Sequence, residues 1–113
     1  MTLVGKRAEL AAALNTIDGV IGYEYRPTTP RPGDAWPLLG PMERDEGRAF
    51  IVTWRVFVFL PQDERAASDW IDAHFDAVVD GLSPVVFVDK GEPFLIPAAG
   101  SEQFCLMIST RSE

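Results

Sequence analysis

The sequence predicts an α+β fold in which two α-helices pack on a mostly antiparallel β-sheet. Two segments show the apolar spacing of amphipathic helices, and the other apolar segments show the alternation or the composition of strands. Strands and helices do not alternate as they do in parallel βαβ units, which favours an antiparallel sheet. At 113 residues the chain has the length of one domain, and we expect a single domain over residues 1–113 that buries its core without disulfides.

The first predicted element is an amphipathic helix over residues 3–17. Its apolar stripe also contains Arg7, and its other positions are rich in alanine, a strong helix former. Thr2 is a suitable N-cap, and Gly19 is a suitable stop. Residues 20–26 then form a β-rich run with two tyrosines, which predicts a strand.

A proline-rich segment follows at residues 27–47, which hold five of the nine prolines. We expect a long loop here, with only a short edge strand at residues 35–39 that Pro37 interrupts. Long loops inside small domains are usually functional, so we also expect this loop to be mobile until a partner orders it.

The strongest strand signal covers residues 48–60. Alternate residues face opposite sides, with Trp54 and Val56 on one side and Phe57 on the other, and both sides are largely apolar. This pattern predicts a central strand that is covered on both faces, at least at its C-terminal end. Arg55 lies in the middle of the strand and needs a partner, because an unpaired buried charge is costly. An ion pair between subunits would supply one.

A second helix is predicted over residues 63–80. Asp63 and Glu64 stand where the helix dipole favours negative charge, and Gly81 and Pro84 follow as stop signals. Acidic residues recur on one face, at spacings of three and four. A solvated face is the ordinary reading of such a stripe, a pair of its carboxylates could bridge a divalent cation, and a repulsive or partner-facing surface is a third interpretation. The stripe consists of Asp69, Asp72, Asp76 and Asp80.

The C-terminal third predicts three further strands. Residues 85–88 and 94–96 read as two short strands joined by a hairpin at Asp89-Lys90-Gly91. Pro93 places the second of them at an edge of the sheet. Residues 103–110 predict a final strand.

Charge and hydropathy exclude several classes of function. The formal net charge is −7, and residues 62–82 alone hold six acidic residues against one arginine. General binding to nucleic acid or to an anionic membrane needs clustered basic residues, so neither is expected. No apolar run approaches the roughly 20 residues that span a bilayer, and the first residues lack the apolar core of a signal peptide, so we expect synthesis in the cytoplasm.

The sequence gives no residue-level support for an enzyme. His74 is the only histidine, its helical neighbours at three and four residues are apolar, and we expect it to be packed or at the rim of the core. Cys105 is the only cysteine, which excludes an internal disulfide and a cysteine-based zinc site. We expect it to be a small core residue, and we expect no cofactor and no bound metal.

The segment from Arg26 to Arg48 mixes charges of both signs with a few large apolar residues, which is typical of a protein contact. The alternative is a loop that Trp36 folds onto its own sheet. With the mid-strand arginine, the candidate interface residues are Arg31, Asp34, Trp36, Leu38, Met42, Arg44, Arg48 and Arg55.

The order of these segments resembles that of the small tail terminator or tail-completion proteins of long-tailed phages, especially those that infect actinobacteria. The resemblance covers nearly the full length and consists of the order of the elements and the general composition of the segments. It is carried by Val20-Ile-Gly-Tyr-Glu-Tyr-Arg-Pro27, Trp36-Pro-Leu-Leu-Gly-Pro41, Phe50-Ile-Val-Thr-Trp-Arg-Val-Phe-Val58 and Arg65-Ala-Ala-Ser-Asp-Trp-Ile-Asp72.

The resemblance implies a structural virion protein of the tail or neck, made in the host cytoplasm. Such proteins form a hexameric ring that caps the tail tube, stops its polymerisation and joins the tail to the head connector or stopper protein. The implied partners are further copies of the chain, the major tail tube protein and the connector, while DNA passes through the lumen. The family has no catalytic residues to carry over. An acidic lumen would let DNA slide by like-charge repulsion, and the candidates are Glu43, Asp45, Glu46, Asp69, Asp72, Asp76 and Asp80.

Two other readings remain. A head-to-tail stopper or another neck protein would have a similar size. From a different class, a small α+β module could bind an apolar ligand between sheet and helices, in a pocket lined by Trp54, Phe57, Phe59 and Trp70.

Overall fold

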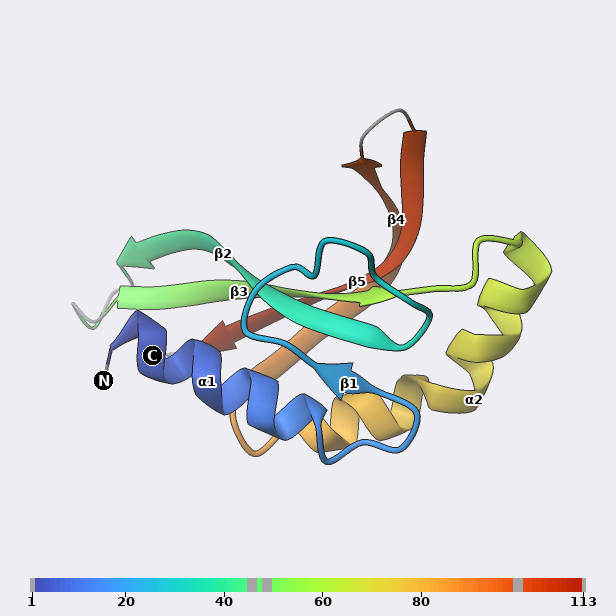
Figure 1. The fold of residues 1–113 in the computed structure, drawn as a ribbon. Coiled ribbons are helices and arrows are strands. Elements are labelled where there is room, and N and C mark those ends of the chain that lie inside the picture. The colour runs from blue at the N-terminus through green and yellow to red at the C-terminus, as the bar shows by residue number, and fades with distance from the viewer. Residues whose placement is uncertain (1, 45–46, 48–49, 99–100, 113) are drawn as a thin grey trace.

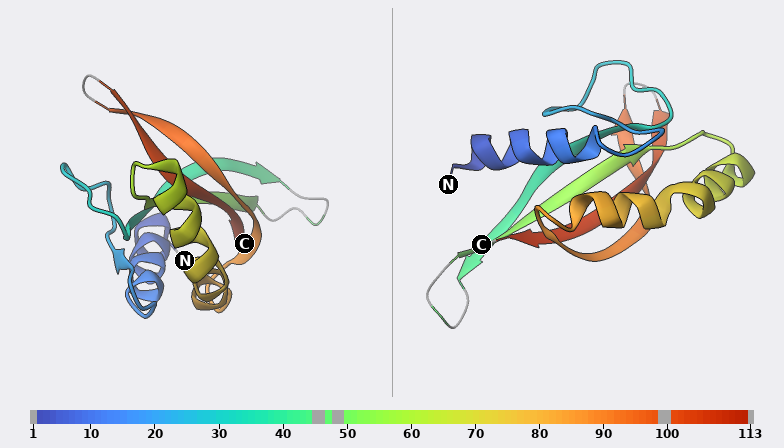
Figure 2. Two further views of the ribbon diagram at one scale, coloured as in Figure 1. Left: turned by 90° about the vertical axis from the view of Figure 1, so that its right-hand side faces the viewer. Right: turned by 90° about the horizontal axis from the view of Figure 1, so that it is seen from below.

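A computed structural model of the chain describes residues 2–44, 47, 50–98 and 101–112. Five strands form one sheet in the order β1-β2-β3-β5-β4, and both helices lie on the same face of it (Figures 1 and 2). The predicted α+β class, with a mostly antiparallel sheet and two helices, is therefore confirmed. The elements are α1 (Leu3–Leu14), β1 (Ile21–Gly22), β2 (Asp34–Arg44), β3 (Phe50–Phe59), α2 (Glu64–Leu82), β4 (Phe87–Ala98) and β5 (Ser101–Ser112).

The first helix begins at the predicted Leu3 and the second at Glu64, one residue after the predicted start, and a side-chain cap satisfies a free backbone donor at each. The Thr2 hydroxyl accepts the Gly5 N–H at 2.9 Å, and the Asp63 carboxylate accepts the Ala66 N–H at 3.1 Å. The first helix ends at Leu14, earlier than the predicted residue 17.

Asn15 accounts for this early end of α1. Its side-chain amide donates to the carbonyls of Ala11 and Gly22, each at 3.1 Å, and its carbonyl oxygen accepts the Gly22 N–H at 2.9 Å. These bonds compete with continuation of the helix and fasten its last turn to β1.

The second helix continues past the predicted stop at Gly81 to Leu82. A Cβ atom at Gly81 would lie 2.5 Å from Cγ1 of Ile17, so this glycine lets the end of α2 approach the turn after α1. The glycine at position 81 is therefore explained by close packing between the two helices, and not by the end of α2.

The strand predicted over residues 48–60 is the centre of the sheet. As β3 it pairs antiparallel with β2 on one side and with β5 on the other. β5 confirms the strand predicted at residues 103–110 and extends it at both ends. The strand predicted at 20–26 is reduced to the two residues of β1, which pair parallel with β2 through Ile21 and Asp34.

The prediction of a long loop over residues 27–47, with only a short strand at residues 35–39, was wrong about the extent of the strand. β2 occupies residues 34–44 and pairs along the length of β3, with a bulge between Leu39 and Met42. Pro37 does not interrupt this strand, because its backbone faces away from β3: its carbonyl accepts a hydrogen bond from Arg7, and the two-residue β1 pairs only with Asp34 and Ala35. The loop is therefore confined to the connection between β1 and β2.

The prediction of two short strands with a hairpin at residues 89–91 was also wrong. β4 runs continuously through this segment and pairs with β5, with a bulge between Val88 and Lys90. Gly91 has a packing role instead, since a Cβ there would lie 2.5 Å from Cε1 of Phe75 on α2. The edge position predicted from Pro93 is confirmed.

The core has one cluster on each face of the sheet. The larger cluster lies between the sheet and both helices and includes Leu10, Trp54, Val58, Val78 and Ile108, all at most 1% exposed. The second cluster lies on the opposite, helix-free face and consists of Trp36, Phe57, Phe59, Ile96, Cys105 and Met107. The prediction that the C-terminal half of β3 is covered on both faces is thus confirmed.

Two β-hairpins extend away from the helices in different directions (Figures 1 and 2). The β2–β3 arm comprises residues 40–44 and 50–53, and the β4–β5 arm comprises residues 92–98 and 101–104. The first arm exposes Met42 and Phe50, which are 51% and 49% accessible to solvent. The second exposes Phe94 and Leu95 at 42% and 54%.

Candidate interaction surface

The only histidine and the only cysteine are both packed into the structure. His74 stacks on Trp70 with 4.2 Å between ring centroids, and its Nδ1 lies 2.9 Å from the Trp70 carbonyl oxygen. Its Nε2 faces Gly19, where an added Cβ would lie only 2.9 Å away. This placement confirms the expected packed histidine.

Cys105 is fully buried in the second cluster, as expected for a core residue. Burial raises the pKa of its thiol to about 11, and the positive charge of Arg26 offsets part of this rise. This basic neighbour could not be predicted from the sequence, because Arg26 and Cys105 are distant in the chain. A neutral thiol is a weak nucleophile, so Cys105 is chemically quiet at neutral pH.

No group of three or more histidine, cysteine, aspartate or glutamate side chains converges to hold a metal ion within residues 2–44, 47, 50–98 and 101–112. No helix in the described part of the chain is long and apolar enough to cross a membrane.

A groove with a volume of about 580 Å³ lies on the helix-free face of the sheet. Its aromatic floor is a chain of rings: Trp36 stacks on Phe57 at 6.1 Å, and Phe57 meets Phe94 at the same centroid distance. The groove thus joins β2, β3 and β4 to the connection that follows β1. Its lining includes Tyr25, Arg26, Trp36, Leu38, Phe57 and Phe94.

Two arginines border this groove, and neutral acceptors hold both of them. Arg7 extends from α1 and donates from Nη1 to the carbonyls of Glu24 and Pro37, at 2.7 and 2.8 Å. Its guanidinium carbon lies 4.3 Å from the centre of the Tyr25 ring. Both N–H groups of Arg7 Nη1 therefore have acceptors. No carboxylate among the described residues forms an ion pair with the guanidinium, so its positive charge is not compensated.

Arg26 borders the same groove from the β1–β2 connection. Its Nη2 donates to the carbonyl of Pro97 at 3.2 Å and to Oε1 of Gln103 at 3.0 Å, and its guanidinium lies 5.9 Å from the Trp36 ring. The ion pairs found within the described ranges do not include Arg26 either. The groove is therefore apolar at its floor and cationic at its rim.

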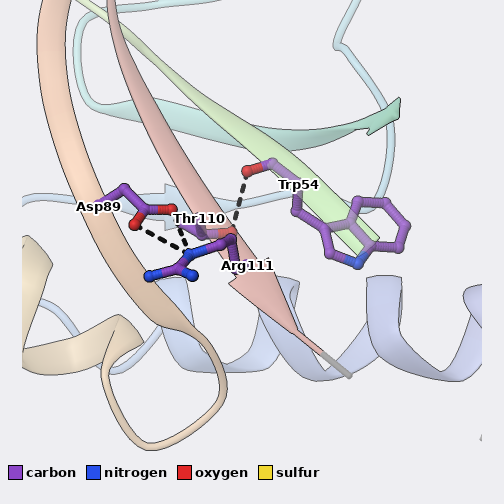
Figure 3. A network of polar contacts seen from close by, with 4 residues as sticks. All are labelled: Trp54, Asp89, Thr110 and Arg111. Atoms are coloured by element: carbon purple, nitrogen blue, oxygen red, sulfur yellow. Dashed lines mark hydrogen bonds and ion pairs between the residues drawn. The ribbon is translucent and has the colours of Figure 1, made fainter. Parts of the chain in front are cut away.

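A second cavity, of about 590 Å³, lies at the C-terminal end of α2, where its lining includes Lys6, Ile51, Val79, Phe87 and Arg111. Its cations have partners. Lys6 Nζ donates to the Val85 carbonyl at 2.8 Å and lies 3.7 Å from Glu9. Arg111 Nε lies 3.0 Å from both carboxylate oxygens of Asp89 (Figure 3). This cavity has no uncompensated charge of the kind found at the groove.

The structure places the predicted interface residues in different environments. Asp34 is buried, and its carboxylate accepts the Arg31 N–H at 2.9 Å, so it closes the turn before β2. Trp36 is 3% exposed, which bears out the alternative in which it folds onto its own sheet. Leu38, Met42, Arg31 and Arg44 are exposed, and Arg48 lies outside the described residues.

Arg55 is half-buried on the helix-free face, where Leu38 is its cross-strand neighbour on β2. The ion pairs between described side chains do not include it. It therefore adds a third positive charge beside the groove. Arg55 was identified from the sequence, but the position of Arg7 and Arg26 at one groove was not. The only signal for it was a charged residue, Arg7, in the apolar stripe of the first helix.

The acidic stripe of α2 faces solvent. Its four aspartates are Asp69, Asp72, Asp76 and Asp80, and all four are exposed. None of them forms an ion pair with a basic side chain that the structure describes. Of the other lumen candidates, Glu43 is exposed on the β2–β3 arm, while Asp45 and Glu46 lie outside the described residues.

The pocket expected between sheet and helices does not form around the four predicted aromatic residues. Trp54 is 1% exposed in the cluster under the helices, whereas Phe57 and Phe59 belong to the cluster on the opposite face. The sheet itself separates them.

Comparison with protein-family models and with curated proteins finds no match to this chain. The functional interpretation therefore depends on the surfaces described above and on the order of the elements along the chain.

Proposed function

We propose that the protein is a tail terminator of a long-tailed phage, a structural subunit that assembles into a hexameric ring. The element order resembles that family, and the fold class agrees with the one the resemblance implies. The single observation that carries the proposal is the pair of hairpin arms, each of which exposes large apolar side chains.

The arms favour association because exposed apolar clusters on a small domain mark contact sites. Met42 and Phe50 lie on one arm, Phe94 and Leu95 on the other, and the arms extend in different directions (Figure 2). Two different patches on one subunit suit a heterologous, head-to-tail contact, which closes into a ring when the rotation between subunits allows it.

In this role the ring caps the last ring of the tail tube, stops tube growth and presents its other side to the head connector or stopper protein. DNA passes through the lumen without specific binding. Glu43 on the β2–β3 arm, with Asp45 and Glu46 next to it in sequence, supplies negative charge for a lumen wall that repels DNA.

The test compares two substitutions of equally exposed residues. Leu95→Asp changes the β4–β5 arm, whereas Ile21→Asp changes β1, and both side chains are 54% exposed. The molar mass in solution is measured by light scattering, alone and with the major tail tube protein of the same phage. We expect the wild type and Ile21→Asp to form the same oligomer, and Leu95→Asp to form less of it.

A wild-type protein that stays monomeric in the presence of tube protein would contradict the proposal. So would an equal loss of assembly in the two variants, because the arm would then have no special role.

A further inference from the structure

We propose that the groove receives the acidic stripe of α2 from a second copy of the chain. This inference rests on the proposed function and deepens it, because it assigns the two surfaces that meet between neighbouring subunits. The groove and the stripe have opposite charge, and they belong to different sides of the same subunit.

The cationic side of the contact is already in place in the single chain. Neutral carbonyls hold Arg7 and Arg26 at the rim of the groove, so their guanidinium groups need no rearrangement before a carboxylate arrives. Each guanidinium has five N–H donors, and the hydrogen bonds within the described residues use only Nη1 of Arg7 and Nη2 of Arg26. Arg55 adds positive charge beside Leu38 on the same face. Arginine at such a rim favours a carboxylate ligand in particular, because its planar fork matches the two carboxylate oxygens.

The acidic side of the contact is a regular helix surface. Asp72 and Asp76 lie one turn apart on α2, and the Cβ atoms of residues at this spacing on a helix are about 5–6 Å apart. Ala73 and Ala77 are exposed beside them. These small side chains let the helix approach an apolar surface such as the ring of Phe94, while the aspartates reach the arginines at the rim.

The position of the two surfaces predicts the symmetry of the contact. The helix α2 lies on one face of the sheet (Figures 1 and 2), and the residues on the floor of the groove belong to the opposite face. A contact between them joins unlike patches, so an open chain of subunits keeps one free groove at one end and one free stripe at the other until a ring closes. A dimer held by one stripe–groove contact cannot have two-fold symmetry, because the two subunits contribute different surfaces.

Of the two predicted lumen surfaces, only the β2–β3 arm is compatible with this contact. A stripe that is buried between subunits cannot line the DNA channel. The acidic residues of the lumen wall would then come from the β2–β3 arm, where Glu43 is exposed.

A charge-exchange experiment tests the contact. Arg26→Glu and Asp76→Arg each place like charges across the proposed contact, and the double variant restores opposite charges with the pair reversed. We expect each single variant to raise the concentration needed for assembly at least tenfold, and the double variant to recover most of this loss. Arg31→Glu is the matched control, because Arg31 is an exposed arginine of the same connection whose side chain does not line the groove.

Assembly is measured by analytical ultracentrifugation at 0.05 and 0.5 M NaCl, with circular dichroism to confirm that each variant is folded. We expect salt to weaken wild-type assembly, since exposed ion pairs are screened. Single variants that assemble normally, or a folded double variant without recovery, would overturn the stripe–groove contact and leave the ring itself standing. Loss of tube-protein binding in Arg26→Glu with unchanged self-assembly would also overturn it, since the groove would then receive the tube protein. A wild type that never assembles would instead contradict the proposed function.

Discussion

Replacing Thr110 by valine should cost the protein about 1–2 kcal/mol of stability. The Thr110 side chain is fully buried, and its hydroxyl donates to the Trp54 carbonyl at 2.9 Å across the β3–β5 pair (Figure 3). Valine keeps the shape but removes the donor, so the buried carbonyl loses one partner. A net hydrogen bond contributes about 1 kcal/mol, and an acceptor left unsatisfied in the core raises the cost.

The neighbouring ion pair provides the comparison. Arg111 Nε and the Asp89 carboxylate lie 3.0 Å apart, which is shorter than many surface pairs, but the two side chains are 49% and 34% exposed. Water and salt screen such a pair, so Asp89→Asn should cost less than about 1 kcal/mol. Asparagine preserves the size of the side chain, and Arg111 keeps its position 4.8 Å from the Phe87 ring.

Urea denaturation followed by circular dichroism measures both effects. At 0.05 M NaCl we expect the larger loss in Thr110→Val, and at 0.5 M NaCl we expect the loss in Asp89→Asn to shrink towards zero while that in Thr110→Val stays the same. This reasoning would be refuted if, at high salt, Asp89→Asn lowered the free energy of unfolding as much as Thr110→Val or more. Burial would then not determine how much each interaction contributes to stability.

Three further predictions follow from the packing. Gly22→Ala should lower the free energy of unfolding by about 1–3 kcal/mol, because the new Cβ would clash with the Ala11 carbonyl oxygen; an unchanged thermal midpoint would contradict this. Cys105 should resist iodoacetamide at pH 8 until urea unfolds the chain, since its thiol is buried. Its pKa of about 11 exceeds the ordinary value of 9.0, so stability should fall as pH rises between these values and stay level below them. Pro93→Val combined with Pro97→Val should increase light scattering by aggregates, since the outer edge of β4 gains two N–H donors, whereas equal scattering would argue against an edge-protecting role.

Local signals in the sequence were sufficient for the helices and for the central strand. Thr2 and Asp63 cap their helices through contacts that lie three residues away, and β3 has an unbroken run of alternating apolar residues. Such features depend on neighbours in the chain, so they can be predicted without knowledge of the rest of the fold.

The extents of β2 and β4 could not be predicted in this way. Pro37 breaks a strand only if its nitrogen must donate to a neighbour, and at this position β1 has already ended, so β2 has no neighbouring strand on that side. Gly91 resembles a turn residue in the sequence, but its role is to make room for Phe75 of α2, more than ten residues away in the chain.

The groove was missed for the same reason. It combines Arg7 and Tyr25 with Phe94, which come from opposite ends of the chain and meet only because the sheet brings β4 towards β2. Sequence reasoning identified Trp36 and Leu38 as contact residues, yet the structure buries the first and exposes the second. Alternation along one strand predicts which face a side chain lies on, and only the full sheet shows what covers that face.

Electron microscopy of growing tail tubes tests the central proposal most directly. The purified protein is added to polymerising major tail tube protein of the same phage, and the lengths and ends of the tubes are recorded. The ring hypothesis predicts short tubes that carry a six-fold ring of extra density at one end, with the ring mass equal to six chains of 12.5 kDa. Tubes of unchanged length with bare ends, alongside a protein that remains monomeric, would contradict it.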